Sequence, residues 1–135
     1  MTRPLPAVTR MAERNMTAHR ITTQANGPTV PPSLAALAEV IAANLRRHFP
    51  AATQQHQQVL GLAEETGEFV GAYRRWAGLA RRPGTWDEVT GELADVVITA
   101  YVTACVLGID LDAAWRTKAP IILARGWRQP PPPAA

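Results

Sequence analysis

The sequence has a single cysteine, few aromatic residues and no long apolar run. The first and the last of these shortages each exclude a class of protein. Cys105 is the single cysteine, so the chain can form no internal disulfide and no all-cysteine metal site. The longest apolar candidate, Val96 to Leu107, falls short of the roughly 18 residues typical of a membrane span. The N-terminus has no apolar segment of the kind found in secretory signals. These absences predict a cytoplasmic protein that does not enter a membrane.

The chain also lacks net positive charge outside its first part. Residues 1–32 carry four arginines against one glutamate, which accounts for the whole net charge of +3. The rest of the chain is therefore neutral overall, and no basic face for a nucleic-acid polymer is expected.

A length of 135 residues allows one domain with a modest core.

The chain divides into a leader, a domain and a tail. Residues 1–32 show no helical or strand period and contain five prolines, which predicts a disordered leader. Apolar residues then recur at three- and four-residue spacing, and this pattern predicts a helical domain over residues 33–128. Residues 129–135 form a Pro-rich tail. The Arg-bearing leader and this tail could also serve as partner-binding segments.

Four helices are predicted within the domain, and no strand pattern is present. The first helix is expected to begin at the cap Ser33 and to end before Pro50, and the second to run from near Thr53 to Trp76 or Leu79. The third begins with a capping box, Thr85 to Glu88, and ends at Gly108. The fourth begins at the cap Asp110 and contains Pro120. We expect Pro120 to kink or end the last helix. Short connections then favour an all-α, four-helix bundle-type domain.

The second and third helices each carry an apolar stripe that we expect to face the core. The stripe of the second contains Val59, Leu62, Phe69, Tyr73 and Trp76, and that of the third contains Val89, Leu93, Val96, Val97, Ala100, Ala104 and Leu107. Two glycines, Gly67 and Gly71, also lie within the second helix, where each costs about 1 kcal/mol relative to alanine. Close helix packing is the expected reason for them, and clearance for a ligand is the alternative.

Acidic residues gather in two short segments of these two helices. Nine of the eleven lie between residues 64 and 112, and five of the nine are Glu64, Glu65, Glu68, Glu92 and Asp95. Carboxylates three residues apart share a helix face and repel one another by a few tenths of a kcal/mol. If the helices pack antiparallel, the pair on one can face the pair on the other. Four converging carboxylates, without His or Cys, are the hard oxygen donors that suit Mg²⁺ or Mn²⁺.

Two other arrangements also gather acidic residues on helices. A solvated acidic face is the ordinary explanation of a charge run. Two matched pairs embedded in apolar helices argue against it, because unpaired negative charge is costly there. A di-iron bundle needs Glu-x-x-His pairs, and none of the histidines, His19, His48 and His56, has a glutamate three residues before it.

The acidic pattern resembles that of a known family. The segments Leu62-Ala63-Glu64-Glu65-Thr66-Gly67-Glu68 and Glu92-Leu93-Ala94-Asp95-Val96 look like the signature of the MazG-like, all-α nucleoside triphosphate pyrophosphohydrolases. The resemblance covers roughly residues 34–125. It implies an enzyme that hydrolyses a nucleoside triphosphate, NTP or dNTP, to the monophosphate and pyrophosphate with Mg²⁺.

The resemblance also implies a role for each acid. Glu65, Glu68, Glu92 and Asp95 would bind the metal, and Glu64 would orient or deprotonate the attacking water. A later Lys-x-x-x-Asn-x-x-Arg segment of the family contacts the nucleotide; Lys118 and Arg125 have this spacing, but Ile122 replaces the Asn and Pro120 falls between. Members of the family assemble as homodimers or homotetramers.

These observations leave two functions open. The first is the Mg²⁺-dependent pyrophosphohydrolase, in which Trp86 beside the acidic helices could stack on the base. The ordinary role of such a tryptophan is core packing. The second is a non-catalytic helical protein of the same fold that binds a nucleotide or metal or serves in assembly, and the departures at Ile122 and Pro120 favour it.

Overall fold

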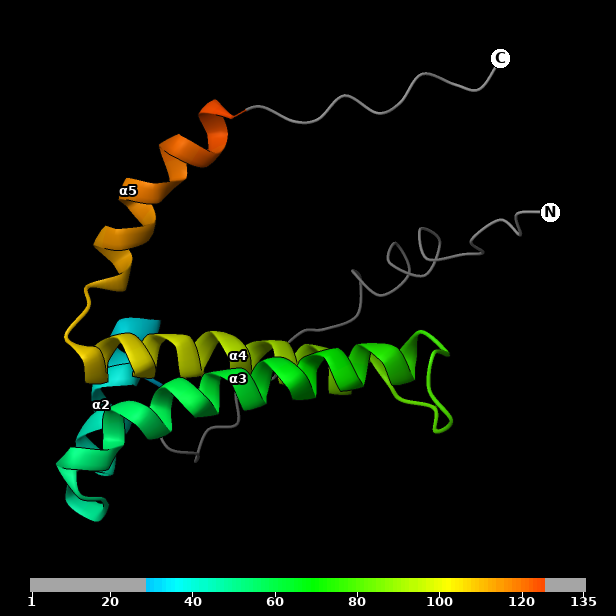
Figure 1. Cartoon of the computed structure of the whole chain (residues 1–135), viewed down its shortest axis with the longest axis horizontal. Helices are drawn as coiled ribbons and strands as arrows, with labels where there is room; N and C mark the ends of the chain where they lie inside the picture. The colour runs from blue at the N-terminus through cyan, green and yellow to red at the C-terminus, as the bar shows by residue number, and fades with distance from the viewer. Residues whose placement is uncertain (1–28, 126–135) are drawn as a thin grey trace.

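The computed structural model describes residues 29–125, which contain four helices and no strand (Figure 1). The helices are α2 (Leu34–His48), α3 (Ala51–Trp76), α4 (Trp86–Leu107) and α5 (Leu111–Ala124). The predicted all-α class is therefore confirmed. Most of the predicted leader and the Pro-rich tail lie outside the described residues.

Side-chain caps fix the starts of three helices, as the sequence predicts. The Ser33 hydroxyl accepts a hydrogen bond from the Ala36 amide at 3.1 Å, and the Asp110 carboxylate accepts one from the Ala113 amide at 2.9 Å. At α4 the capping box is complete, because the Glu88 carboxylate accepts from the Thr85 amide at 2.9 Å. These bonds satisfy amides that have no partner within the first helical turn.

The helix ends follow from local backbone chemistry. Gly108 ends α4 with a φ of 72°, a left-handed conformation that favours glycine. The buried Gln54 side chain donates to the carbonyls of Leu45 and Phe49, at 3.1 and 2.8 Å, and so ties the end of α2 to the start of α3. Pro120 does not end α5, which continues to Ala124.

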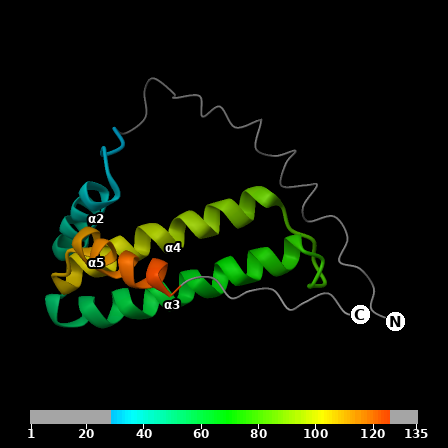
Figure 2. The same ribbon diagram turned by 90° about the horizontal axis from the view of Figure 1, so that it is seen from above.

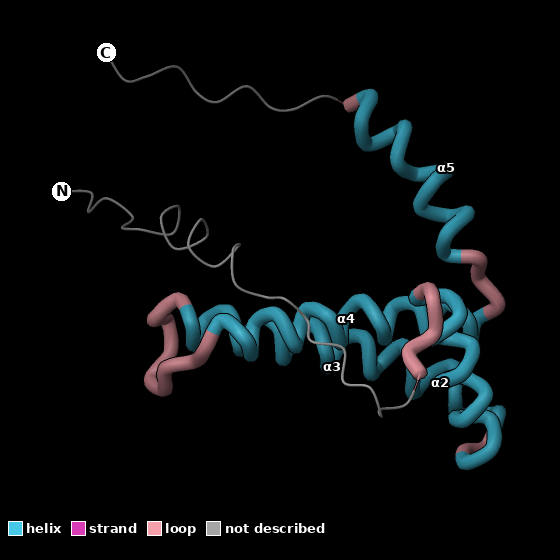
Figure 3. The backbone as a smooth tube through the Cα atoms, turned by 180° about the vertical axis from the view of Figure 1, so that it is seen from behind, coloured by secondary structure: helices cyan, strands magenta, loops and turns pink. Residues whose placement is uncertain are grey.

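Three of the helices pack together, with α4 between the other two. Helices α3 and α4 run antiparallel and side by side (Figure 1, Figure 2). Helix α2 packs against the C-terminal half of α4, where Ala38 and Tyr101 line the same cavity. Helix α5 leaves the end of α4 and projects away from the other helices (Figure 3). Its first turn is tethered by the Tyr101 hydroxyl, which donates to the Asp112 carboxylate at 2.8 Å.

The core differs from the predicted stripes because it is narrow. Its buried apolar side chains are small: Ala38, Ala42, Ala72, Val89, Val102 and Ala104. Leu62, Phe69 and Trp76 are half-buried against α4, whereas Val59 and Tyr73 are exposed. On α4, Leu93, Val97 and Leu107 are likewise exposed. One face of the α3–α4 pair therefore holds apolar side chains that the other described helices do not cover.

Helix α4 is also the one described helix that is long and apolar enough to cross a membrane, by length and composition. The same properties are common in the central helix of a soluble bundle. Here α4 contacts both α2 and α3 and carries Glu92 and Asp95 along its length. These contacts bury 22% of the apolar window of α4.

The mid-helix glycines are not explained by close helix packing. A Cβ built on Gly67 meets nothing within 4 Å, and one on Gly71 meets only the end of the Arg75 side chain at 3.4 Å. We therefore predict that Gly67→Ala raises the free energy of unfolding by about 0.5–1 kcal/mol, because alanine is the better helix former. Thermal or urea denaturation measures this directly. A destabilised variant would mean that another molecule approaches this backbone.

Candidate metal centre

Three carboxylates from two helices meet in the half of the α3–α4 pair that is nearer the connecting loop. Glu65 and Glu68 lie one turn apart on α3, and Glu92 lies in the second turn of α4. One carboxylate oxygen of each lies within 4.8 Å of one oxygen of each other member. Glu65 and Glu92 are half-buried, and Glu68 is exposed. The spacing predicted from sequence therefore places acids from both helices at one point.

The antiparallel register that brings these helices together is fixed at several places. The Thr103 hydroxyl of α4 donates to the Gln58 carbonyl of α3 at 3.1 Å. At the other end, the loop before α4 turns back so closely that a Cβ on Gly84 would lie 2.7 Å from the Arg75 Cβ. Only glycine fits there without a shift of the backbone. The Trp76 and Trp86 rings add a contact, with centroids 4.7 Å apart.

The electrostatic consequence is concentrated on Glu65. Partial burial raises the pKa of its carboxyl group, and the neighbouring charges of Asp95, Glu68, Glu92 and Glu64 raise it further, in that order. Burial penalises the charged form, and each carboxylate nearby makes a further negative charge more costly. No described cation is among the causes. The cluster thus lacks a positive partner from this part of the chain.

Asp95 and Glu64 lie near the cluster but outside its three-residue centre. Asp95 is the largest charge acting on Glu65, which places it beside that side chain although it does not belong to the tight group. Glu64 has the smallest effect of the four acids and is exposed, so it lies at the edge of the cluster. A further acid, Glu88, lies one turn before Glu92 on α4 and is engaged in the cap of that helix.

The donor chemistry fits a hard divalent cation. All members of the tight group are carboxylates, and no histidine or cysteine of the described residues joins it. Mg²⁺ and Mn²⁺ prefer such oxygen donors, whereas zinc sites usually include nitrogen or sulfur. Two carboxylates on one helix and one on another can bind an ion while leaving part of its coordination shell open. The residues therefore fit the Mg²⁺ that the sequence predicts.

The predicted base-stacking residue, Trp86, lies at the N-terminus of α4. The residue is 38% exposed, and its ring packs at a tilt of 56° on Trp76, which in turn contacts Tyr73 at 5.7 Å between centroids. The Trp86 side chain therefore packs against Trp76 and also leaves part of its surface exposed to solvent. It precedes Glu92 by six residues, or about 9 Å along the helix axis.

The predicted phosphate-binding cations lie on the projecting helix. Lys118 and Arg125 are exposed, as is Ile122 between them. Because α5 points away from the α3–α4 pair, the structure does not gather these side chains with the carboxylates (Figure 1).

A hydrogen-bonded group at the base of α5 has no clear sequence signal. Asp112 accepts from the Tyr101 hydroxyl at 2.8 Å and from the Trp115 indole at 3.2 Å. These bonds lower the pKa of Asp112, with the Tyr101 bond the largest cause. The group fixes where α5 begins, and the eleven-residue separation of Tyr101 and Asp112 could not be read from helical spacing.

Comparison with known proteins leaves the family open. No family model matches the chain, and no curated protein or solved structure matches it significantly. The resemblance to the MazG-like enzymes therefore rests on the acidic segments alone.

The raised pKa of Glu65 predicts how stability depends on pH. A folded-state pKa above the ordinary value of 4.5 means that the folded chain favours the neutral carboxyl. The neutral carboxyl therefore contributes to the free energy of unfolding. This contribution is fully present below the ordinary pKa and is lost as pH rises through the raised pKa. In chelator, Glu65→Gln should therefore have a higher melting temperature than wild type at pH 7 and the same one at pH 4.

The matched control for this pH profile is Glu39→Gln, an exposed carboxylate on α2. Thermal melts between pH 4 and 8 should leave its profile parallel to that of wild type. Equal profiles for the two variants would show that the cluster does not strain Glu65.

Proposed function

We propose that the chain is a Mg²⁺-dependent nucleotide pyrophosphohydrolase, which cleaves a nucleoside triphosphate to the monophosphate and pyrophosphate. The observation that supports it is the meeting of Glu65, Glu68 and Glu92 from two helices within 4.8 Å. The raised pKa of Glu65 adds support, because a cluster of mutually repelling carboxylates is stabilised when it binds a cation.

In this proposal Glu65, Glu68 and Glu92 hold the metal, and Asp95 completes the set. When bound, Mg²⁺ supplies positive charge that offsets the phosphates and stabilises the leaving pyrophosphate. The chain itself has little positive charge to offer at this point, since no described cation acts on Glu65. Binding of the anionic substrate therefore depends on the metal, and the carboxylates serve chiefly to retain it.

Glu64 is the proposed general base. Its exposed carboxylate lies at the edge of the cluster, where a water molecule can approach. The water oxygen attacks the α-phosphorus, the bond between this phosphorus and the oxygen that bridges it to the β-phosphorus breaks, and Glu64 accepts a proton of the water. Pyrophosphate and the nucleoside monophosphate leave. No side-chain nucleophile is required, and Cys105 lies away from the acids in the cavity between α2 and α4.

The nucleotide would be held by groups farther from the metal. The exposed surface of Trp86 offers a stacking platform for a base. Lys118 and Arg125 offer charge to the phosphates, provided that α5 takes another position in the assembled or substrate-bound protein.

A panel of NTPs and dNTPs with Mg²⁺ tests the proposal. Wild type should release pyrophosphate and monophosphate from at least one of them, and chelator should abolish the release. Glu65→Gln and Asp95→Asn should each lower kcat/KM by at least about 100-fold, since loss of a supporting group alone costs 10–100-fold at metal sites. The control Glu39→Gln should retain wild-type turnover, because Glu39 lies on α2.

Full activity in Glu65→Gln would contradict the assignment of the site. Absence of turnover on the entire panel, with metal bound to the protein, would contradict the catalytic function itself.

A second candidate is a non-catalytic protein of the same fold that binds metal or nucleotide. The position of α5 favours it, because Ile122 is 54% exposed and α5 projects away from the acidic helices (Figure 1). This candidate predicts that calorimetry detects binding of a nucleotide together with Mg²⁺. It also predicts that the substrate panel yields no pyrophosphate.

A further inference from the structure

The face of α3 that carries the metal centre also carries a cation, Arg75, two helical turns beyond Glu68. Seven residues make about two full turns, so the two side chains leave α3 in nearly the same direction, roughly 10 Å apart along the axis. Gly71 lies between them, three residues after Glu68 and four before Arg75. Arg75 is half-buried, whereas its neighbour Arg74 is exposed. The acids and this cation therefore share one strip of the helix.

The Arg75 side chain is held along this strip at both of its ends. Its Cβ packs against the loop before α4, where a Cβ on Gly84 would lie 2.7 Å away. Its guanidinium reaches back toward the metal centre, because the Nη1 atom lies 3.4 Å from the place that a Cβ would take on Gly71. A side chain that is already positioned in this way loses less freedom when it binds a ligand.

The described part of the chain leaves this guanidinium without a partner. Among residues 29–125, neither a carboxylate nor an aromatic ring pairs with it. The carboxylate of Glu88, which also lies close to Gly84, bonds to the Thr85 amide instead. Arg75 is also absent from the groups that shift the pKa of Glu65. The guanidinium therefore lies beyond the acids and does not neutralise them.

Gly71 keeps the surface between the acids and Arg75 low. Glycine costs helix stability, and no neighbouring helix needs the space, since a Cβ built here meets only the end of the Arg75 side chain. With hydrogen in place of a side chain, a ligand can lie against the backbone of α3 between Glu68 and Arg75. Clearance for a ligand is thus the explanation of Gly71 that agrees with its surroundings.

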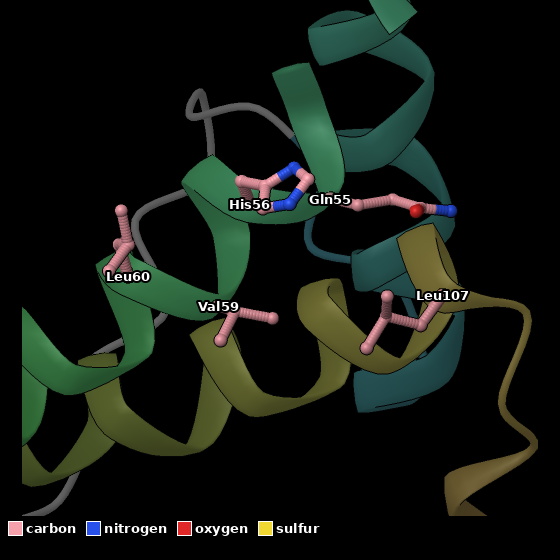
Figure 4. A pocket seen from close by; sticks show the side chains of 5 residues that line it. All are labelled: Gln55, His56, Val59, Leu60 and Leu107. Atoms are coloured by element: carbon pink, nitrogen blue, oxygen red, sulfur yellow. The ribbon is translucent and has the colours of Figure 1, made fainter. Parts of the chain in front are cut away.

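The opposite direction along the α3–α4 pair offers no such charge. There the two helices line a cavity of about 310 Å³ with apolar side chains such as Val59, Leu60 and Leu107 (Figure 4). None of the side chains that line this cavity is a lysine or an arginine. An anion that extends from the metal centre therefore meets a permanent positive charge toward the α3–α4 loop and none toward the cavity.

We propose that Arg75 binds the phosphate chain of the substrate, which runs from the metal across Gly71 to the guanidinium. A planar guanidinium can donate two parallel hydrogen bonds to one phosphate, and such charge-assisted bonds are stronger than neutral ones. Metal and arginine then hold the same chain at two points, without any movement of α5. The assignment rests on the proposed function, since it takes the phosphate chain to be that of a nucleoside triphosphate.

Calorimetric titration of the full chain with inorganic tripolyphosphate, at saturating Mg²⁺, tests this contact without turnover. Arg75→Gln should weaken binding at least about tenfold, because hydrogen bonds to a charged group are lost. Gly71→Ala should weaken it at least about fivefold, because the added methyl group occupies the path of the chain. Gly71→Ala also guards against misfolding, since alanine favours the helix.

Arg74→Gln is the matched control, because Arg74 is exposed and leaves α3 about 100° away from Arg75. It should bind tripolyphosphate like wild type, and all three variants should keep the Mn²⁺ affinity and the helical circular dichroism of wild type. A wild type that binds Mn²⁺ but no tripolyphosphate would overturn the proposal. So would equal affinities in Arg75→Gln and wild type, or an equal loss in Arg74→Gln.

Turnover separates this inference from the proposed function. If the chain hydrolyses a nucleotide, Arg75→Gln should raise the KM at least about tenfold. If it hydrolyses none, yet Arg75→Gln loses tripolyphosphate binding, the catalytic function fails and the phosphate site stands. If it hydrolyses one with the same KM in Arg75→Gln, the phosphate site fails and the catalytic function stands.

Discussion

The antiparallel contact between α3 and α4 determines both the fold and the candidate site. It places Glu65 and Glu68 against Glu92, with Asp95 near enough to act on Glu65. Repulsion among these groups opposes the contact, and packing of Leu62, Phe69 and Trp76 along the same helices favours it. The Thr103 to Gln58 hydrogen bond and the close turn at Gly84 fix the register. A cation at this point would convert the repulsion into attraction, which links stability to metal binding.

The same contact divides the pair into two surfaces of different chemistry. One carries the acids, and the other carries exposed apolar side chains such as Val59, Leu93 and Val97. The buried core consists of alanine and valine side chains, so a single copy leaves much of its larger apolar surface in water. A divalent cation held by the acids would add to the stability of this small core.

Local signals in the sequence predict the helices well. Ser33, Thr85 and Asp110 cap as expected, Gly108 ends α4, and the spacing of Glu65 and Glu68 places both beside Glu92. The features that the sequence did not predict depend on tertiary contacts. The stripes of α3 and α4 are wider than one neighbour can cover, so their periodicity could not show that Tyr73 and Val97 would be exposed. The course of α5 was also hidden, because the bond between Tyr101 and Asp112 joins two helices.

The central claim is that the carboxylates of α3 and α4 bind a divalent cation. The most direct test is a crystal structure of the full chain grown with Mn²⁺, with data collected for anomalous scattering by manganese. We expect a peak between Glu65, Glu68 and Glu92, within about 2.5 Å of oxygens from both helices. A map with no peak at this position, or with manganese bound only elsewhere on the chain, would contradict it.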